Sequence, residues 1–400
     1  MSNTDILLVI EGTYPWYRGG VSEWVHQYIQ NCPNQNFHIL QVATDQYLNA
    51  QVSEALYQIP EHVHSFCRIP PPDLRKDWQV ESYRWKNRLR EKTSRLVNQC
   101  DFVHIANTGF AGWLGKEWAE DTNKPLLLTE HALYWKEVDM GAVALECGYK
   151  IPDNRGKKEQ YVQMFKSMAR DIYLAADITV SVSECNITEQ QNMGADDVMY
   201  IPNGIPASWL KEHKSHQDPL TIGWVGRCAE MKNPMKFFEL VDAARQMEIA
   251  DIQFLMLCCD ANEPELAGGV KKKSKQYSEL ELIWNQSTEN YIDEMDALCI
   301  TSHNESQPLV LFEALARRVL PIGWQAGDVT EKYALIINKG VDSNKLLRKT
   351  LELWYRPYKW ERYIREKSLL LAEQHTWENI FKRYRGVFDL LLKESPLYNG

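Results

Sequence analysis

The fold is indicated first by the stretch DILLVIEGTYPWYRGGVSEWVHQYIQ, residues 5–30. Its apolar run ILLVI (6–10) predicts a buried strand, and the apolar spacing of VSEWVHQYIQ predicts a helix that begins near Val21. Aromatic residues, an arginine and the pair Gly19-Gly20 lie between them. A strand, a glycine-bearing loop and a helix in this order are typical of one unit of an α/β sheet.

The same alternation of short apolar runs and helical patterns continues along the whole chain, which favours parallel sheets. In the first half the predicted strands are 6–10, 37–43, 102–106, 125–130, 178–183 and 198–202. In the second half they are 220–226, 252–258, 297–302, 319–324 and 334–338. Because 400 residues suit two domains of roughly 200 each, we predict two Rossmann-like domains. Their junction is the polar stretch IPNGIPASWLKEHKSHQDP (201–219).

The composition is typical of a soluble globular protein, with 44% hydrophobic and 25% charged residues. A net charge of -9 argues against broad nucleic-acid binding. No charged leader with an apolar core precedes the first predicted strand, and no apolar run reaches about 18 residues. The nine cysteines form no CxxC motif, and adjacent Cys258-Cys259 are expected to be buried thiols. We therefore expect a cytoplasmic, reduced protein that contacts membranes at most peripherally.

One segment of the first half is basic. Between Arg68 and Arg95 there are nine Lys or Arg residues against four Asp or Glu, most of them in RWKNRLREKTSR (84–95). A solvated helix face accounts for such a pattern, and a surface for a membrane or an anionic acceptor is the alternative.

The glycine pair Gly19-Gly20 precedes a predicted helix, where free backbone N–H groups and the helix dipole attract anions. Glycine also lets a backbone approach a ligand without a Cβ atom in the way. The stretch matches neither the GxGxxG fingerprint nor the GxxxxGK[ST] phosphate loop. A tight turn and an anion-binding loop therefore both remain open for this pair.

A second cluster is GWVGRCAEMKNP (223–234), which follows a predicted strand and carries Arg227 and Lys232 on a loop. Two cations beside a helix start can hold a diphosphate, with Arg available for bidentate contacts and Lys as a point charge. They would also stabilise charge that develops on a departing diphosphate. Exposed surface charges are the alternative interpretation of this cluster.

A third cluster is NESQPLVLFEALARR (304–318), which contains Glu305 and Glu313. Glu305 follows a predicted strand and precedes a helix start at Pro308, since proline is favoured at the first helical position. Glu313 is predicted one and a half turns into that helix. Both carboxylates would then lie near the mouth of the same cleft.

The separation of these two glutamates is not informative alone, because Glu281 and Glu289 are equally far apart. That second pair lies in a more polar segment for which we predict no strand. Carboxylates at a cleft mouth are good acceptors for the hydroxyl groups of sugars, which favours the first pair as a site.

A fourth cluster is TEHALYWKE (129–137), where His131 follows the predicted strand 125–130. A lone histidine at a strand end is either structural or part of a site, and the residues leave both open. The chain contains no HExxH motif, no paired CxxC and no DxD triplet. We therefore expect neither a dedicated metal ion nor another cofactor.

Together the four clusters resemble the retaining glycosyltransferases of family 4. The resemblance covers nearly the whole chain, and the stretches EGTYPWYRGGVSEWVH, TEHALYW and GADDVMYIPNGIP are most similar to the branch that contains the Pel exopolysaccharide glycosyltransferase. It implies the α/β GT-B fold, with two facing Rossmann-like domains, a cleft between them and a C-terminal helix that crosses back. The acceptor-side domain would be residues 1–204 with helix 376–395 packed on it, and the donor domain residues 205–375.

The resemblance also implies four catalytic residues. His131 would contact the transferred sugar in the catalytic centre. Arg227 and Lys232 would bind the donor diphosphate and stabilise it as it leaves. Glu305 would accept hydrogen bonds from the hydroxyl groups of the donor sugar.

Further donor-binding positions follow from the same resemblance. The backbone of Gly19 and Gly20 would approach the diphosphate, and Glu313 would bind the ribose hydroxyl groups. Backbone groups near Gln307 and Leu309 would lie by the phosphate and the ribose.

The implied activity is transfer, with retention at the anomeric carbon and without a metal ion, from a nucleotide-diphosphate sugar. A UDP-sugar is favoured as donor, and the acceptor would be a growing polysaccharide or a lipid-linked saccharide. The alternatives are a sugar-nucleotide epimerase of the same fold and a non-catalytic nucleotide-sugar-binding protein.

The chain departs from the family after Glu313, where the pattern is EAxAxGxP with small residues before a proline. Here ARRVLP places Arg317 and Arg318 in that segment, and Leu320 at the position of the proline. Asp328 replaces a second glycine of the family. These departures concern the loop beneath the donor sugar, and therefore the identity of that sugar.

Overall fold

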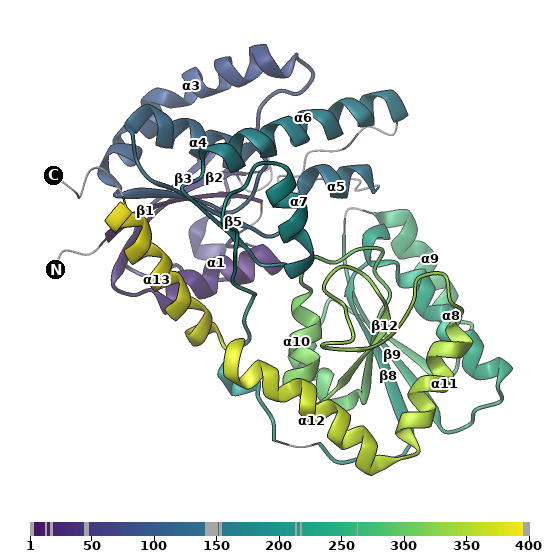
Figure 1. The fold of residues 1–400 in the computed structure, drawn as a ribbon. Helices are drawn as coiled ribbons and strands as arrows, with labels where there is room; N and C mark the ends of the chain where they lie inside the picture. The colour runs from purple at the N-terminus through teal and green to yellow at the C-terminus, as the bar shows by residue number, and fades with distance from the viewer. Residues whose placement is uncertain are drawn as a thin grey trace. The chain divides into compact units, whose positions relative to one another are not determined.

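The computed structural model describes residues 4–394 except 13, 17–18, 44–47, 141–150, 152–153, 213, 217 and 262 (Figure 1). The chain divides into two compact units. Unit 1 comprises the described residues up to Pro202 together with those from Ile380 onward, and unit 2 comprises Asn203–Asn379. Among the described helices, none has the length and apolar character needed to cross a bilayer.

Unit 1 is a parallel sheet with helices on both faces. Its strands are β1 (Thr4–Glu11), β2 (Gln35–Val42), β3 (Val63–Ile69), β4 (Phe102–Ile105), β5 (Leu126–Glu130), β6 (Ile178–Ser181) and β7 (Met199–Tyr200). Its helices are α1 (Gly20–Asn31), α3 (Trp78–Gln99), α4 (Phe110–Thr122), α5 (Tyr134–Asp139), α6 (Arg155–Ala175), α7 (Ile187–Asn192) and most of α13 (Trp377–Glu394), with short 3-10 turns η1 (Val52–Glu54) and η2 (Glu184–Asn186). The strand order β3-β2-β1-β4-β5-β6-β7 contains the doubly wound Rossmann order.

The two faces of this sheet have different cores. Leu7, Val9 and Leu40 belong to a cluster shared with α3, α4 and α6. On the other face, the ring of Tyr28 in α1 packs on Phe37 of β2 and on Phe381 of α13, with ring centroids 5.0 and 5.3 Å apart. Helix α13 therefore completes the core of unit 1.

A buried chain of hydrogen bonds ties these elements together. The Tyr28 hydroxyl lies 2.9 Å from Nδ1 of His104, whose Nε2 lies 2.9 Å from Oγ1 of Thr129. That oxygen is in turn 3.2 Å from the hydroxyl of Tyr384 in α13. Because buried polar groups need partners, this chain fixes how α1, β4, β5 and α13 pack within unit 1.

Unit 2 repeats the same plan. Its strands are β8 (Leu220–Arg227), β9 (Ile252–Cys259), β10 (Leu280–Trp284), β11 (Ala297–Ile300), β12 (Leu320–Trp324) and β13 (Leu335–Ile337). Its helices are α8 (Pro234–Gln246), α9 (Pro264–Ser274), α10 (Leu309–Ala316), α11 (Ser343–Trp354) and α12 (Pro357–Gln374), with short 3-10 turns η3 (Ala207–Trp209), η4 (Glu230–Lys232), η5 (Thr288–Asn290) and η6 (Ile292–Glu294). The order β10-β9-β8-β11-β12-β13 is the Rossmann order, so both predicted Rossmann-like sheets are present.

The start of α13 is held within unit 2. The backbone N–H of Ile205 donates to the carbonyl of His375 at 2.7 Å, and the N–H of Trp377 donates back to the carbonyl of Ile205 at 3.0 Å. From Ile380 onward the same helix belongs to unit 1. The C-terminal helix therefore returns to the first half of the chain, as the resemblance implied (Figure 1).

The predicted strands are all present, with ends within two residues of the prediction, but two strands were missed. These are β3 and β10, which lie at the edges of the two sheets. Glu281 belongs to β10, so the prediction that its segment holds no strand was wrong. Residues of both strands are mostly half-buried or exposed, and edge strands that carry polar side chains lack the apolar signal of central ones.

Two helix starts differ slightly from the prediction. The first helix begins at Gly20, not Val21, with Gly19 as its N-cap residue. Pro308 is the N-cap residue of α10, which begins at Leu309, so Glu313 lies just over one turn into the helix. The cysteines of the described part, including Cys258 and Cys259, are all free thiols.

Candidate functional site

The predicted site residues of unit 2 lie at the point where its strand order reverses. From β8 the chain winds outward through β9 and β10, and it then returns to β11 on the other side of β8. Ligands of doubly wound sheets bind at such a switch point, beyond the carboxyl ends of the strands. Arg227 is the last residue of β8, Lys232 lies on the loop after it, and Glu305 lies on the loop after β11.

Hydrogen bonds hold these two loops side by side. The Trp224 indole N–H donates to Oγ1 of Thr301 at 2.8 Å, and the Thr301 hydroxyl donates to the carbonyl of Lys232 at 2.8 Å. The N–H of His303 donates to the carbonyl of Met231 at 3.0 Å. The loop after β8 is therefore fixed against the loop after β11.

The result is an ion pair between Lys232 and Glu305. Nζ of Lys232 lies 2.5 Å from Oε1 of Glu305, and the Ser302 hydroxyl donates to the same oxygen at 2.6 Å. Glu305 is only 9% exposed, so its carboxylate needs these donors. The structure thus brings together a cation and a carboxylate that are far apart in sequence.

The backbone of Gly327 packs closely against the backbone of Glu305. Its φ of +56° favours glycine, and a Cβ atom there would lie 1.6 Å from the carbonyl oxygen of Glu305. The next residue, Asp328, donates its N–H to that same oxygen at 3.2 Å. The replacement of the family's second glycine at Asp328 therefore leaves the support of Glu305 in place.

The remaining predicted donor residues lie nearby in the same unit. Arg227 is exposed and Glu313 is half-buried on α10, whose first residue is Leu309. Gln307 is 7% exposed, and its side-chain oxygen accepts the backbone N–H of Asn203. The side chain of Gln307 thus has a structural role, which leaves its backbone for the role implied by the resemblance.

The two arginines after α10 are engaged elsewhere in unit 2. Arg318 has a φ of +62°, a conformation that glycine adopts more easily and that fits the glycine of the family pattern. Its Nε–H donates to the carbonyl of Lys211 at 2.7 Å. The guanidinium of Arg317 lies 3.4 Å from Asp293 and over the ring of Trp209. Both arginines therefore stabilise the turn before β12.

In unit 1, the pair Gly19-Gly20 follows β1, at the switch point between β1 and β4. Gly19 is in extended conformation, with a φ of -163°. Among the described residues, a Cβ atom on either glycine would meet no atom within 4 Å. Since neither conformation nor crowding in the described part requires glycine here, the tight-turn interpretation loses its support. The pair provides a backbone without side chains at the start of α1, which a ligand could approach closely.

His131 directly follows β5 and is 9% exposed. Its ring meets the indole of Trp24 of α1 edge-on, with centroids 4.8 Å apart. Burial lowers the pKa of His131 to about 3, so the imidazole is neutral at neutral pH. Its Nε2 has no hydrogen-bond partner among the described residues, which leaves this nitrogen available to a ligand.

Two buried carboxylates at the carboxyl ends of the unit 1 strands were not predicted. Glu130, beside His131, accepts hydrogen bonds from Thr108 at 2.5 Å, from Gln190 at 2.8 Å and from Tyr173. Burial raises the pKa of Glu130 to about 6, against the opposite effect of these donors. Glu11, the last residue of β1, accepts the N–H of Ala111 at the start of α4 at 3.0 Å. The available signal was a polar residue directly after each apolar run.

The depressed pKa of His131 predicts how stability depends on pH. Below about pH 6.5 the ring is protonated in the unfolded chain, whereas in the native state it stays neutral down to about pH 3. The contribution of His131 to stability is therefore complete above pH 6.5 and is lost as the pH falls. Near pH 5 the contribution of one such ring is about 1.4 kcal/mol per pH unit. His131→Asn should lower, by that amount, the slope of the free energy of unfolding against pH, as measured by urea unfolding. At about pH 8 the slopes of the two proteins should agree. Equal slopes at pH 5 would contradict a buried neutral His131.

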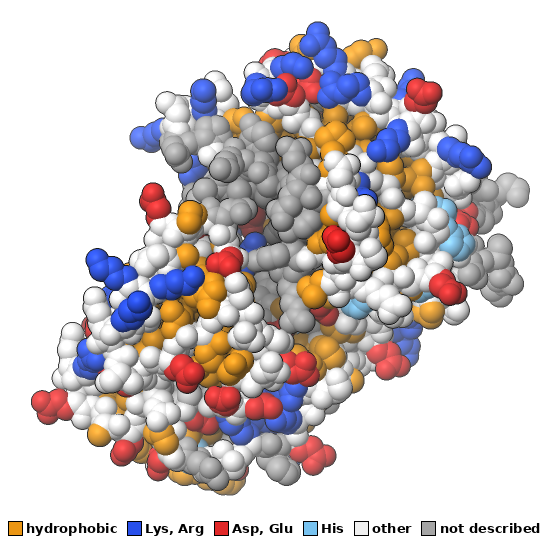
Figure 2. Space-filling view, turned by 180° about the vertical axis from the view of Figure 1, so that it is seen from behind, with side chains coloured by type: hydrophobic (Ala, Val, Ile, Leu, Met, Phe, Trp, Pro, Cys, Tyr) orange, Lys and Arg blue, Asp and Glu red, His pale blue; other side chains and the backbone are white. Residues whose placement is uncertain are grey.

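The basic segment predicted as a possible acceptor or membrane surface lies in α3. Lys86 pairs with Glu117 and Asp121 at 2.8 and 2.9 Å, and Arg88 pairs with Glu81 at 2.6 Å. Figure 2 shows red side chains among the blue ones along the upper edge of the view, where α3 lies. Carboxylates therefore compensate part of the positive charge of this helix, and both interpretations of the segment remain open.

Comparison with known proteins identifies the fold. A family model described as a domain of unknown function (DUF3492) matches residues 4–87 and 85–198. No curated protein matches the sequence. Among solved structures, sucrose-phosphate synthase from Thermosynechococcus elongatus matches with a TM-score of 0.73 at 16% identity, over 98% of this chain and 100% of that one.

Two further structures agree with this match. HepE from Anabaena, in complex with UDP and glucose, has a TM-score of 0.73 at 12% identity and covers 97% of this chain and 100% of its own. A glycosyltransferase from Rickettsia africae has a TM-score of 0.69 at 15% identity, over 99% and 100%. The chain therefore has the GT-B fold of these glycosyltransferases. At such identities the likeness establishes the fold alone, and function has to be argued from the site.

Proposed function

We propose that this protein is a retaining glycosyltransferase that moves a sugar from a nucleotide-diphosphate sugar to a saccharide acceptor. The observation that carries the proposal is the pair of Lys232 and Glu305 at the switch point of unit 2. A cation suits the phosphate oxygens of a donor, and a carboxylate suits the hydroxyl groups of its sugar. The contact between the two side chains supports the proposal, because the phosphate and the sugar of a nucleotide-sugar are bonded directly to each other.

In the proposed reaction the bond between the anomeric carbon and the diphosphate breaks, and negative charge develops on the departing phosphate. Lys232 and Arg227 stabilise that charge, and Glu305 orients the sugar. The backbone N–H groups at Leu309, Gly19 and Gly20 contribute further donors to the diphosphate.

The acceptor has to lose a proton in this reaction. A ring whose pKa is about 3 is not a base at neutral pH, so His131 acts as a hydrogen-bonding partner of the transferred sugar. The departing phosphate oxygen takes the proton instead, on the same face of the sugar, which retains the anomeric configuration. The proposed mechanism needs no metal ion.

For the donor we propose a UDP-sugar, with Glu313 as partner of the ribose hydroxyl groups. HepE of the same fold was solved with UDP and with UDP-glucose, whereas a starch synthase from Arabidopsis thaliana was solved with ADP and acarbose. For the acceptor we propose a growing polysaccharide or a lipid-linked saccharide, in agreement with the resemblance in residues 11–26 and 194–206. The charge compensation on α3 gives no support for a membrane contact as part of this function.

Thermal unfolding with UDP, GDP and ADP tests the proposal first. At about 100 times its Kd, a bound nucleotide stabilises the native state by about 2.7 kcal/mol, which raises Tm by roughly 5–10 °C for a unit of this size. We expect the shift with UDP, and its loss when Arg227 and Lys232 are both replaced by Ala. A shift with GDP or ADP would reassign the donor.

The class of reaction is tested by incubating the preferred nucleotide-sugar with oligosaccharide acceptors in EDTA and assigning the product anomer by NMR. Retention in the product is expected. Conversion of the donor to an epimer without any acceptor would establish the epimerase alternative. A nucleotide shift without transfer or epimerisation would establish the non-catalytic nucleotide-sugar-binding alternative, and no shift with any nucleotide would contradict the proposed donor site.

A further inference from the structure

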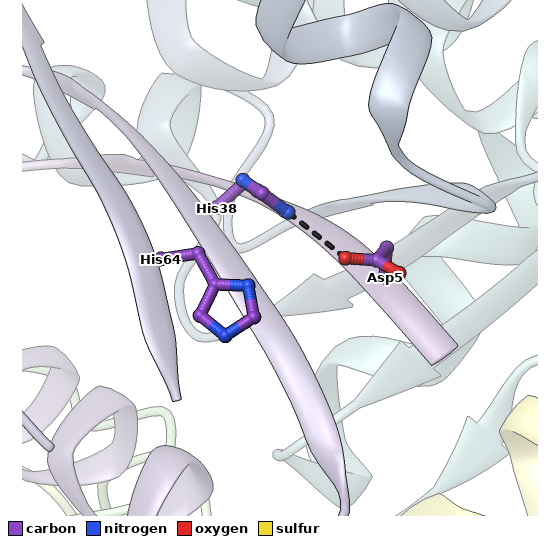
Figure 3. A group of neighbouring side chains, drawn as sticks. All are labelled: Asp5, His38 and His64. Carbon is purple, nitrogen blue, oxygen red and sulfur yellow. Dashed lines mark hydrogen bonds and ion pairs between the residues drawn. The ribbon is translucent and has the colours of Figure 1, made fainter. Parts of the chain in front are cut away.

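Three potential metal ligands meet on neighbouring strands of unit 1, near the amino ends of these strands (Figure 3). They are Asp5 on β1, His38 on β2 and His64 on β3, and one ligand atom of each lies within 4.8 Å of the others. Nε2 of His38 lies 3.0 Å from Oδ1 of Asp5. Two donors that are each about 2.1 Å from one ion lie roughly 3.0–3.4 Å apart, so this pair is already spaced for a shared ion.

The pairing of β3 with β2 brings His64 beside His38, at a point where the register shifts by one residue. Phe37 pairs with Val63, but the next residue, His38, pairs with Ser65. His64 is therefore the extra residue of a β-bulge, and bulges change the direction of a side chain. The rings of His64 and His38 lie nearly perpendicular with centroids 5.8 Å apart, so both imidazoles border the same small space.

The second nitrogen of His38 is also held. Nδ1 lies 2.8 Å from Oγ of Ser65, and the His38 side chain is only 7% exposed. A hydrogen bond at the far nitrogen fixes the orientation and tautomer of a metal-bound histidine. Asp5 is likewise fixed by the amide of Asn36, which donates to its Oδ1 at 3.2 Å. The site therefore has oriented ligands and supporting partners.

We propose that Asp5, His38 and His64 bind one transition-metal ion, for which Zn²⁺ is the best match. Two imidazole nitrogens and one carboxylate oxygen are a common zinc ligand set, with water completing the four positions. The half-exposed Asp5 carboxylate, at 29% exposure, and the exposed His64 leave a path for the ion.

The ion would act on structure rather than on catalysis. Asp5 is the second residue of β1 and His64 the second of β3, so the site lies towards the amino ends of the strands, away from Glu11 and His131. Because β3 is an edge strand and the ligands come from three adjacent strands, one ion links the edge to the interior of the sheet. The site is independent of the proposed glycosyltransferase function.

The test uses the full chain without a histidine tag, stripped with EDTA and titrated with Zn²⁺ against a chromophoric chelator. We expect one ion per chain and a rise in Tm of roughly 5–10 °C at about 100 times the Kd. His64→Ala should weaken Zn²⁺ binding by at least about tenfold, and Ser65→Ala by about 10–100-fold through the lost support of His38. The near-ultraviolet spectrum of the Co²⁺ form should lack thiolate charge-transfer bands, which separates this site from the free cysteines.

His62→Ala is the matched control. His62 precedes the same strand, and its Nε2 is already bonded to the carbonyl of Ile29 at 2.9 Å, so its loss should leave the Zn²⁺ affinity unchanged. Glycosyl transfer should be equal in wild type and in His64→Ala. The result of the Zn²⁺ experiment is therefore independent of whether the proposed transferase activity is found. No saturable binding in the wild type, or an unchanged Kd in His64→Ala, would overturn the proposal.

Discussion

Replacement of Lys232 by Ala is expected to lower kcat by about 10²–10³-fold, the usual effect of removing one group that stabilises transition-state charge. Lys232 is the cation that contacts Glu305, so its loss removes charge stabilisation and leaves a carboxylate that is 9% exposed with fewer donors. The measurement is steady-state turnover of the nucleotide-sugar that wild type prefers. Because the interaction strengthens as the bond breaks, kcat should fall more than KM rises.

The control for this prediction is Lys236→Ala. Lys236 lies four residues further on, at the start of α8, where it pairs with the exposed Glu239 and lies 5.0 Å from the ring centroid of Trp324. A surface ion pair contributes little, so its loss should change kcat less than about twofold. Turnover by Lys232→Ala within tenfold of wild type would contradict the assigned role, whereas equal losses in both variants would indicate a general effect of charge.

The sequence predicted the α/β sheets because central strands are apolar on both faces and are recognised as continuous runs. The edge strands β3 and β10 were missed because their side chains are half-exposed and partly polar, as in VHSFCRI (63–69). Helix ends were predicted to within a residue at Gly20 and at Leu309. Local residue preferences therefore account for most of the secondary structure.

The candidate site was predictable only in part. The rule that ligands bind beyond the carboxyl ends of strands selects Arg227, Lys232 and Glu305 from sequence. The contact between Lys232 and Glu305 depends on β8 lying beside β11, which the sequence does not specify. The buried state of Glu130 likewise depends on Tyr173 and Gln190, which come from distant helices.

The cluster of Asp5, His38 and His64 was not predictable at all. Motif searches find metal ligands that are close in sequence, whereas these three come from separate strands. The deciding feature is the pairing of β1, β2 and β3 side by side in this register, which no residue type marks. The expectation of no metal ion rested on the absence of such motifs, which does not address ligands that come from separate strands.

The second large effect is expected from Gly327→Ala, which should lower the stability of unit 2 by about 3 kcal/mol. A φ of +56° costs a residue with a Cβ atom about 1–2 kcal/mol. The added Cβ would also lie 1.6 Å from the carbonyl oxygen of Glu305, and such overpacking costs about 1–3 kcal/mol. The expected fall in Tm is roughly 6–12 °C for a unit of this size. Because relief of the clash shifts the backbone of residue 327 against that of Glu305, we also expect kcat/KM to fall by about 10²-fold.

Two other glycines separate the contributions to this effect. Gly340 has a φ of +82° but open space around it, so Gly340→Ala should show the backbone strain alone, with activity unchanged. Gly268, in α9, has neither strain nor a close neighbour, and Gly268→Ala should stabilise by about 0.5–1 kcal/mol through helix propensity. Thermal unfolding and donor turnover of the three variants therefore form a graded series. If Gly327→Ala were no worse than Gly340→Ala in both measurements, the contact beneath Glu305 would not position the site. A larger loss in Gly327→Ala, confined to turnover and donor affinity, would instead tie the geometry of this loop directly to the proposed transfer reaction.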